Sequence, residues 1–461
     1  MRIQTIKSEG IAALSYFVSS GNEAMVIDPR RDSAIYKHLA DEEKADILHI
    51  FETHRNEDYV TGSLEVKQMF PEARIGHSDQ TKFGYGDDNL ADAESFKIGN
   101  MKVTCIQTPG HTDDSICYIV ADLTVGTDPI VAFTGDTLFV NEVGRTDLVD
   151  IKKHELMSEK LYNSLHEKLL PIGDGVIIHP GHGSGSVCGG NISNREFSTI
   201  GFEKANNIWL GMSEDEFVES KVQQRLTLAS YFKHCEHLNT IGPPIIRDLP
   251  EHQELGVEQF SDLLHQDNHR AIDTRSSSEF VERHIPRSIS LSITNMGRLA
   301  GLALRPEQSF SIILQKNNSD LSLASILLHR IGYDNVIGYL KNGLEKWVAS
   351  GRELDSIEEL SLEELAARQT RREVTVIDVR EPHEFDKEHI EDSLSFPLTK
   401  LEEASKEFEL HSPVVTLCPS GFRNTTAASI LKRKGVNDIS VSLAGLKAWK
   451  DHDFPLEKDR N

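Results

Sequence analysis

Short apolar runs alternate with polar loops through the first 240 residues, and several of the loops contain histidine or aspartate. The apolar runs predict buried strands at residues 24–27, 47–51, 101–108, 116–120, 130–133 and 176–178. Loops that follow four of these runs carry His54, His111, Asp136 and His182. Each of these side chains alone could be a turn residue or a helix cap. Their recurrence at strand ends instead predicts that they converge on one metal site.

The second half of the chain repeats itself after a proline-rich connector at residues 241–250. The repeated residues are Asp273, Arg275, Glu279, Phe280, His284 and Ile285, which recur 105 positions later as Asp378, Arg380, Glu384, Phe385, His389 and Ile390. We therefore expect an α/β protein of three domains, at about residues 1–240, 251–353 and 356–461. The last two would be a tandem pair.

Amino-acid composition and net charge exclude some classes of binding partner and favour one cellular compartment. The hydrophobic content of 38% and the charged content of 26% are typical of a soluble globular protein. The net charge of −24 argues against nucleic acid and against anionic membrane surfaces as partners. The N-terminus lacks the pattern of a signal peptide, and no apolar run is long enough to span a bilayer, so we expect a cytoplasmic protein. Five scattered cysteines fit a reducing compartment better than a disulfide framework.

The first of the four histidine- or aspartate-bearing loops reads Thr53-His54-Arg55-Asn56-Glu57-Asp58-Tyr59. It resembles the Thr-His-x-His-x-Asp-His signature of the metallo-β-lactamase fold, with Asn56 and Tyr59 in place of the second and third histidines. Residues 133–147 and 181–190 are similar to those of persulfide dioxygenases, including members fused to rhodanese domains, and glyoxalase II is a more distant relative. The resemblance implies an N-terminal metallo-β-lactamase fold, an αβ/βα sandwich, followed by two tandem rhodanese-like α/β domains.

In the persulfide dioxygenases that this chain resembles, the residues that match His54, His111 and Asp136 hold iron. Two histidines and one carboxylate form the facial triad of non-haem Fe(II) oxygenases, in which open positions admit a thiolate and O₂. Because Asn56 and Tyr59 remove ligands of a second metal, we expect one Fe(II) per chain. The same ligand types also suit zinc, which stays an alternative.

Five further residues around this triad are candidates for supporting roles. Arg145 could pair with a substrate carboxylate, such as that of glutathione, or form a structural ion pair. Tyr59 could donate a hydrogen bond to bound oxygen or sulfur, or only fill space. Asp58 and His182 are candidates to orient the metal ligands. Cys188 could accept or relay a sulfane sulfur, or be a passive small residue.

A cysteine loop in the last repeat carries a second candidate chemistry. An apolar strand at residues 414–417 precedes Cys418, and a helix is predicted from Thr425 onward. The spacing Cys-x-x-Gly-x-Arg, with Gly421 and Arg423, resembles the active-site loop of rhodaneses and, more loosely, the Cys…Arg loop of phosphatases. Gly421 permits a tight curl. We expect backbone N–H groups and Arg423 to lower the pKa of the Cys418 thiol and produce a reactive thiolate.

The middle repeat lacks this loop chemistry. Gln315, Asn318 and Asp320 stand at the positions of the cysteine, the glycine and the arginine. We therefore expect the domain at residues 251–353 to be catalytically inactive and structural. A retained small-molecule site is the alternative.

The resemblance as a whole implies an enzyme of sulfane-sulfur metabolism. The first domain would oxidise a low-molecular-weight persulfide, such as glutathione persulfide, to sulfite with O₂. Cys418 would transfer sulfur between thiosulfate, sulfite and a thiol. Two alternatives stay open: a zinc-dependent thioesterase of glyoxalase II type with a sulfurtransferase attached, and a non-oxidising binding domain beside an active Cys418. The expected partners are these small molecules rather than nucleic acid or membrane, and a homo-oligomer is compatible with the sequence.

Overall fold

The computed structural model describes the chain except for residues 225, 227, 316–318, 403–412 and 458–461. The described residues divide into two compact units. The first unit is assigned residues 1–228, 232–248 and 330–332, and the second residues 229–231, 249–329 and 333–461. The proline-rich connector therefore lies where the first unit gives way to the second. No helix in the described ranges is long and apolar enough to cross a membrane.

The first unit is built on two sheets. As far as it is described, each sheet has six strands, in the orders β1-β2-β3-β4-β5-β6 and β12-β11-β10-β9-β8-β7. The strands are β1 (Arg2–Ser8), β2 (Ala13–Ser20), β3 (Glu23–Ile27), β4 (Asp46–Phe51), β5 (Arg74–Ser78), β6 (Asp88–Leu90), β7 (Ser95–Ile98), β8 (Met101–Gln107), β9 (Ile116–Asp122), β10 (Val131–Gly135), β11 (Ile177–Pro180) and β12 (Ser198–Thr199). Strands β3 to β6 run parallel, as do β10 and β11, and the other neighbours are antiparallel.

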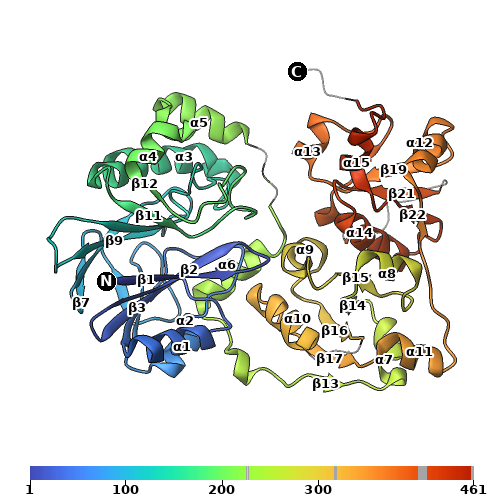
Figure 1. Ribbon diagram of the computed structural model, residues 1–461, viewed down its shortest axis with the longest axis horizontal. Coiled ribbons are helices and arrows are strands. Elements are labelled where there is room, and N and C mark those ends of the chain that lie inside the picture. The colour runs from blue at the N-terminus through green and yellow to red at the C-terminus, as the bar shows by residue number, and fades with distance from the viewer. Residues whose placement is uncertain (225, 227, 316–318, 403–412, 458–461) are drawn as a thin grey trace. The chain divides into compact units, whose positions relative to one another are not determined.

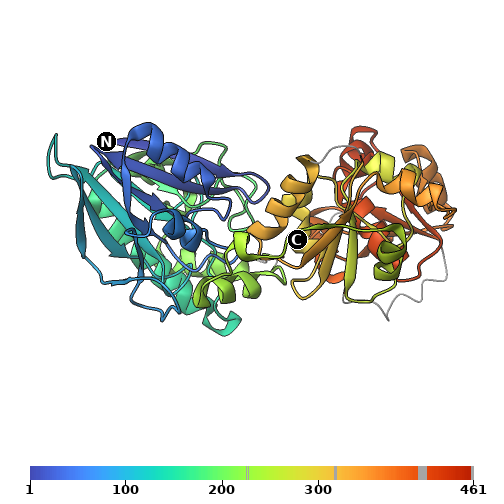
Figure 2. The same ribbon diagram turned by 90° about the horizontal axis from the view of Figure 1, so that it is seen from below.

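Helices cover the outer faces of both sheets, and the inner faces pack on each other. The helices are α1 (Ala34–Glu43), α2 (Ser63–Met69), α3 (His154–Asn163), α4 (Ile200–Asn206), α5 (Glu214–Gln223) and α6 (Phe232–Ile241). Phe51 of the first sheet stacks on Tyr118 of the second, with ring centroids 4.6 Å apart, inside a shared buried cluster. Residues of α1 and α2 pack on the first sheet, and those of α3 and α5 on the second (Figure 1, Figure 2). The expected αβ/βα sandwich is confirmed.

The strands predicted from apolar runs are all present, with ends that differ by one or two residues. They correspond to β3, β4, β8, β9, β10 and β11. Strands such as β9 and β10 are buried along their whole length because the other sheet covers one face and helices cover the other. The short strands β6, β7 and β12 carry no comparable apolar run, so the sequence pattern did not predict them.

The second unit contains the internal repeat as two parallel sheets of the same strand order. In the described residues these are five-stranded, β13-β17-β16-β14-β15 and β18-β22-β21-β19-β20. The strands are β13 (Gln253–Glu254), β14 (His269–Asp273), β15 (Ile289–Ser290), β16 (Ser309–Ile313), β17 (Val336–Leu340), β18 (Glu358–Glu359), β19 (Thr375–Asp378), β20 (Leu394–Ser395), β21 (Val414–Leu417) and β22 (Ile439–Val441). The helices are α7 (Val257–Leu264), α8 (Ser277–Glu282), α9 (Met296–Ala303), α10 (Ser319–Arg330), α11 (Gly343–Ala349), α12 (Leu362–Thr370), α13 (Pro382–Lys387), α14 (Phe422–Arg433) and α15 (Gly445–Asp451). The equal strand order confirms a tandem pair of α/β domains.

Residues that repeat at the offset of 105 have the same structural roles in both domains. Arg275 pairs with Asp273, and Arg380 pairs with Asp378, each at 2.6 Å. In each pair the arginine also donates to a backbone carbonyl eight residues further on. The repeated sequence thus specifies a buried ion pair that fastens a strand to the segment after the following helix.

Helix α14 of the last domain packs against the middle domain. Thr426 Oγ1 donates to the Ser290 carbonyl at 2.7 Å, and the Ser290 N–H donates to Ser429 Oγ at 3.1 Å. Arg270 of the middle domain also pairs with Glu402 of the last domain at 2.9 Å. These contacts support a structural role for the middle domain, because α14 is the helix that follows the Cys418 loop.

Candidate functional site

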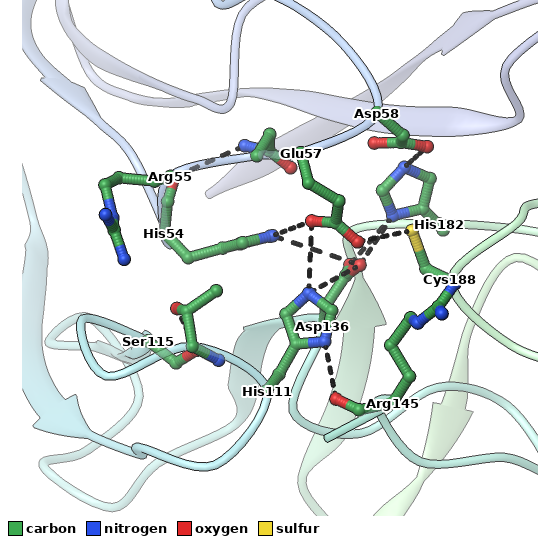
Figure 3. A network of polar contacts seen from close by, with 12 residues as sticks. His54, Arg55, Glu57, Asp58, His111, Ser115, Asp136, Arg145, His182 and Cys188 are labelled. Atoms are coloured by element: carbon green, nitrogen blue, oxygen red, sulfur yellow. Dashed lines mark hydrogen bonds and ion pairs between the residues drawn. The ribbon is translucent and has the colours of Figure 1, made fainter. Parts of the chain in front are cut away.

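The four residues predicted to form a metal site lie together at the carboxyl ends of strands from both sheets (Figure 3). His54 follows β4, His111 follows β8, Asp136 follows β10 and His182 follows β11. All four side chains are buried. Strand ends from two facing sheets therefore bring together residues that are up to 128 positions apart in the sequence.

Glycines let two of these loops approach each other closely. Gly135 has a left-handed φ of 48°, which turns the chain directly before Asp136. A Cβ on Gly181 would lie 2.5 Å from Asp136 Oδ1. The glycines that directly precede Asp136 and His182 are thus required for this turn and this close packing.

Two histidines and one carboxylate form a group that could hold a metal ion. The ligand atoms of His54, His111 and Asp136 lie within 4.8 Å of one another. Asp136 Oδ2 is 3.6 Å from His111 Nε2 and 4.0 Å from His54 Nε2. Neither Nε2 atom has a hydrogen-bond partner among the described residues. These separations exceed hydrogen-bond lengths but approach the roughly 3–3.5 Å between ligands that each lie about 2.1 Å from a shared ion.

Both histidines are held by their other ring nitrogen. Thr53 Oγ1 donates to Asp28 Oδ2 at 2.8 Å, so it accepts from His54 Nδ1 at 2.9 Å. His111 Nδ1 donates to the Arg145 carbonyl oxygen at 3.0 Å. With the proton on Nδ1, each imidazole presents its Nε2 lone pair to the centre of the group. The residues therefore fit a metal ion.

The charges of this group also favour a proton on His54. Burial lowers the pKa of His54, but Glu57 and Asp136 raise it, to about 9 overall. A metal and a proton compete for the same nitrogen, so metal binding by this group depends on pH.

Glu57 is a member of the group that the sequence analysis missed. Its side chain is fully buried, and Oε2 lies 3.4 Å from His111 Nε2 and 3.7 Å from His54 Nε2 (Figure 3). Its Oε1 accepts a hydrogen bond from the Cys188 thiol at 3.2 Å. The fold's signature has no ligand at this position, so motif matching passes over it. The available signal was a carboxylate directly after Asn56, where a histidine is missing.

His182 and Asp58 form a second buried group beside the first. His182 Nδ1 lies 2.8 Å from Asp136 Oδ1, and its Nε2 lies 3.0 Å from Asp58 Oδ2. Burial lowers the pKa of His182, but Asp136 and Asp58 raise it well above its usual value. A charged His182 would hold Asp136 in place, as proposed for an orienting residue. With Cys188, the same two residues also form a candidate metal group, so one metal per chain stays a prediction.

The two residues that replace histidines in the signature have structural contacts. Asn56 Nδ2 donates to the His54 carbonyl at 3.4 Å. The buried Tyr59 ring meets the His182 ring edge-on, with centroids 6.0 Å apart. Tyr59 therefore packs against His182, and its role toward a bound ligand stays a prediction.

The Arg145 guanidinium donates hydrogen bonds to other residues of the chain. Its Nε and Nη2 donate to the two carboxylate oxygens of Asp147 at 2.7 and 2.8 Å, and Nη1 donates to the Val187 carbonyl at 3.1 Å. This geometry is a bidentate structural ion pair. Pairing of Arg145 with a substrate carboxylate stays a prediction, while its backbone carbonyl positions His111.

Cys188 lies beside the metal group as a buried thiol. Burial raises the pKa of Cys188 well above its usual value, and the nearby carboxylates of Asp58 and Glu57 raise it further. The side chain packs with Phe139 and Ile192. The surroundings favour the protonated thiol, and a sulfur-relay role stays a prediction.

The Cys418 loop has the curl that its sequence predicts. Gly421 has a left-handed φ of 82°, and a Cβ there would lie 2.3 Å from the Leu443 carbonyl oxygen. Helix α14 begins one residue after Gly421, which is earlier than predicted. Arg423 pairs with both carboxylate oxygens of Glu384, at 2.7 and 2.9 Å.

The expected lowering of the Cys418 pKa is wrong. The residue is only 1% exposed, and burial raises the pKa of its thiol above the ordinary value. Arg423 and the N–H groups of Ser420 and Asn424 lower the pKa, as predicted, but they do not offset burial. Arg423 also shares its charge with Glu384, so the thiolate is the minor form in this loop.

The middle domain has a glutamine where the last domain has its cysteine. Gln315 Nε2 donates to Glu279 Oε1 at 3.2 Å, Asp320 lies in the first turn of α10, and Asn318 lies outside the described residues. A cavity of about 260 Å³ opens here, lined by Arg275, Glu279, Glu282, Arg283, Gln315 and residues 342–345. This lining, as far as it is described, contains no cysteine, which fits an inactive loop. Because of this cavity, a retained small-molecule site stays the alternative to a purely structural middle domain.

Known proteins resemble both parts of the chain. The family described as Rhodanese-like domain matches residues 256–350 and 361–452. The mitochondrial hydroxyacylglutathione hydrolase of Saccharomyces cerevisiae is 34% identical over 155 residues, which are 32% of this chain and 54% of the yeast protein. The mitochondrial persulfide dioxygenase ETHE1 of Bos taurus is 28% identical over 211 residues, which are 45% of this chain and 73% of the bovine protein. This chain thus spans about half the length of the yeast hydrolase.

A solved structure resembles a larger part of the chain. The metallo-β-lactamase from Staphylococcus aureus subsp. aureus COL matches with a TM-score of 0.66 and 25% identity, over 74% of this chain and 99% of that chain. The expected metallo-β-lactamase fold and the two rhodanese-like domains are therefore confirmed. Hydroxyacylglutathione hydrolases and persulfide dioxygenases match at comparable identity, so likeness alone does not select a reaction.

Proposed function

We propose that this chain, a persulfide dioxygenase-like metallo-β-lactamase-fold domain fused to two rhodanese-like domains, is an iron-dependent persulfide dioxygenase that also transfers sulfur. Its domains would be residues 1–240, 251–353 and 356–461. The buried group of His54, His111 and Asp136 carries the proposal, because its ligand atoms face one another. Two histidines and one carboxylate are the ligand set of non-haem Fe(II) oxygenases.

The first reaction would oxidise a small persulfide such as glutathione persulfide. One persulfide, one O₂ and one water give one thiol, one sulfite and two protons, so the outer sulfur is oxidised and O₂ is reduced. A bound iron ion would supply the redox chemistry. The chain's own part is to hold His54 through Thr53, His111 through a backbone carbonyl and Asp136 through His182. Burial of these groups excludes bulk water from the site.

The second reaction would pass sulfur through Cys418. Its thiolate attacks the outer sulfur of thiosulfate, the S–S bond breaks and sulfite leaves, and a thiol acceptor then takes the sulfur as a persulfide. Backbone N–H groups of Ser420 and Asn424 act on the sulfur and favour its anionic form. In this direction the second reaction would supply the persulfide that the first consumes, in the reverse direction it would consume the sulfite that the first releases, and fusion raises the effective concentration of both.

A zinc-dependent thioesterase is the second candidate, because the yeast hydroxyacylglutathione hydrolase has higher identity to this chain than the bovine dioxygenase. Against it, Asn56 and Tyr59 remove two imidazoles of the metallo-β-lactamase signature, and the Asn56 amide bonds to a backbone carbonyl. The third candidate is a binding domain without turnover, which would leave only Cys418 active.

Oxygen uptake and metal analysis separate these candidates. The full chain is loaded anaerobically with Fe(II) and given glutathione persulfide in an oxygen electrode, and the zinc-loaded chain is given S-lactoylglutathione. We expect one sulfite per O₂ from the iron form. Thioester hydrolysis by the zinc form, with no O₂ uptake by the iron form, would establish the thioesterase instead. Inactivity in both assays, with intact thiosulfate sulfur transfer, would establish the binding domain.

A further inference from the structure

We infer that Glu57 is a fourth ligand of the metal centre, so that this chain holds its metal with two histidines and two carboxylates. The inference rests on the proposed metal centre and adds a residue to it. Glu57 Oε2 faces the same point as the ligand atoms of the triad, 3.4 Å from His111 Nε2 and 3.7 Å from His54 Nε2 (Figure 3). Both distances are shorter than those from the same nitrogens to Asp136 Oδ2, 3.6 and 4.0 Å.

Hydrogen bonding does not explain where Glu57 Oε2 lies. The oxygen is buried and has no hydrogen-bond partner in the described part of the chain. His54 and His111 both use their Nδ1 atoms on protein oxygens, so each presents a lone pair at Nε2. With both imidazoles in this neutral form, two lone pairs and a carboxylate oxygen repel one another at 3.4–3.7 Å in a buried site, and a proton on His54 satisfies only one of the two nitrogens. A cation bound between them removes this repulsion and satisfies all three atoms.

The loop backbone directs Glu57 inward. Asn239 of helix α6 donates from Nδ2 to the carbonyls of Asn56 and Tyr59 at 2.7 and 2.8 Å. The Asn56 side chain bonds back to the His54 carbonyl. With the residues on both sides fastened, the Glu57 side chain is directed toward His54 and His111.

The other carboxylate oxygen of Glu57, Oε1, has a hydrogen-bond donor. Cys188 donates its thiol hydrogen to Oε1 at 3.2 Å, which orients the carboxylate so that Oε2 faces the two histidines. Cys188 is thus a positioning residue for the ligand in this arrangement. A carboxylate with one oxygen held by the protein and the other aimed at a cation is the usual environment of a metal ligand.

Cobalt binding to the full-length, metal-free protein tests the inference. Co(II) reports its affinity by chelator competition and its ligand set by visible absorption, without any turnover. The Glu57→Gln variant keeps the size of the side chain and removes its charge. We expect it to bind Co(II) roughly 100-fold or more weakly than wild type, because loss of an outer partner alone costs about 10–100-fold. Its absorption band should also shift in position or intensity.

A control variant makes the test specific. Glu142→Gln replaces another buried carboxylate, outside the group, and should leave affinity and spectrum unchanged. If Glu57→Gln does not fold, Glu57→Asp replaces it and should show weakened binding and a shifted band.

The outcomes distinguish this inference from the proposed function. Wild-type affinity and an unchanged spectrum in Glu57→Gln would overturn the role of Glu57 and leave the triad intact. Failure of the wild-type chain to bind Co(II), Fe(II) or Zn(II) would overturn both. Weakened binding and a shifted band in Glu57→Gln alone would support the fourth ligand, whether or not the iron form consumes O₂.

Discussion

Among single residues, the role of each histidine depends on which ring nitrogens are already used. His54 and His111 give Nδ1 to protein oxygens and leave Nε2 for a cation. His182 has a carboxylate beside each nitrogen, from Asp136 and Asp58. Identical side chains are thus suited to hold a cation or to orient a neighbouring carboxylate, according to their partners.

His111→Ala should lower metal affinity by roughly 100-fold or more and abolish O₂ uptake, since it removes an imidazole that presents a lone pair to the site. Metal content after gel filtration and an oxygen electrode measure the two effects. His166→Ala, which alters a histidine stacked on Tyr162 away from the site, is the matched control. A His111→Ala protein that keeps its metal would contradict the assignment.

Stability of the metal-free chain should fall as the pH rises from 6.5 to 8. The pKa of His54 is raised from 6.5 to about 9 in the folded state, so the folded state binds more protons than the unfolded state in this window. The free energy of unfolding should fall by about 1–2 kcal/mol over this window through the titration of His54. Above about pH 8, Lys221, whose pKa is lowered to about 8 by burial, adds an opposing change.

Thermal unfolding of metal-free and metal-loaded protein at several pH values measures this effect. Metal takes the place of the proton, so the loaded protein should lack this loss. His54→Asn removes this titrating group and should make the metal-free profile less steep than that of wild type, while His182, whose pKa is also raised, keeps part of the slope. A metal-free wild-type profile that rises between pH 6.5 and 8 would show that His54 is neutral in the folded chain.

Among the elements, both sites are built where a strand gives way to a loop shaped by glycine. Gly181 admits Asp136 beside the end of β11, and Gly421 turns the chain between β21 and α14. In both places a methyl group would meet an atom at 2.5 Å or less, either a ligand oxygen or a backbone carbonyl. Both loops therefore require glycine at these positions.

Gly181→Ala should weaken metal binding by roughly 10–100-fold, because the added Cβ would lie 2.5 Å from Asp136 Oδ1 and displace this carboxylate. Gly175→Ala, six residues earlier, is a matched control, since no heavy atom lies within 4 Å of its Cβ position. Co(II) titration compares the two variants. Equal affinity in both would mean that the loop relaxes around the methyl group.

In the whole molecule, the two candidate chemistries belong to different compact units. His54, His111 and Asp136 lie in the first unit and Cys418 in the second. The middle domain shares the second unit with Cys418 and contacts helix α14. Nothing in either described site requires a side chain of the other for its own chemical step.

Cys418→Ser should therefore abolish sulfur transfer from thiosulfate and leave oxidation of ready-made glutathione persulfide near the wild-type rate. A serine hydroxyl has a much higher pKa than a thiol and cannot carry the sulfur by this route. With thiosulfate and glutathione as the sulfur source, O₂ uptake should disappear. His54→Ala should give the opposite pattern.

Thiocyanate or persulfide formation and an oxygen electrode, applied to both variants, check the separation. The sulfur-transfer assay on His54→Ala is the internal control for correct folding of the second unit. If Cys418→Ser loses oxidation of free persulfide, the persulfide passes through Cys418 first, and the independent-sites interpretation fails.

The sequence alone determined the parts of this protein that depend on local pattern. Apolar runs located the central strands, because a strand buried on both faces must be apolar along its length. The constant offset of 105 residues located the tandem domains. The curl of the Cys418 loop was predicted from Gly421, because a few neighbouring residues define such a turn.

Only the tertiary structure decided the features that depend on distant partners. Glu57 enters the metal group because Asn239, more than 180 positions away, holds the backbone on both sides of it. In the folded chain the Arg145 side chain points toward Asp147 and donates two hydrogen bonds to its carboxylate. Burial of Cys418 outweighs the charges that favour its thiolate. Side-chain direction and desolvation are set by the packing of elements far apart in sequence, which a local pattern does not contain.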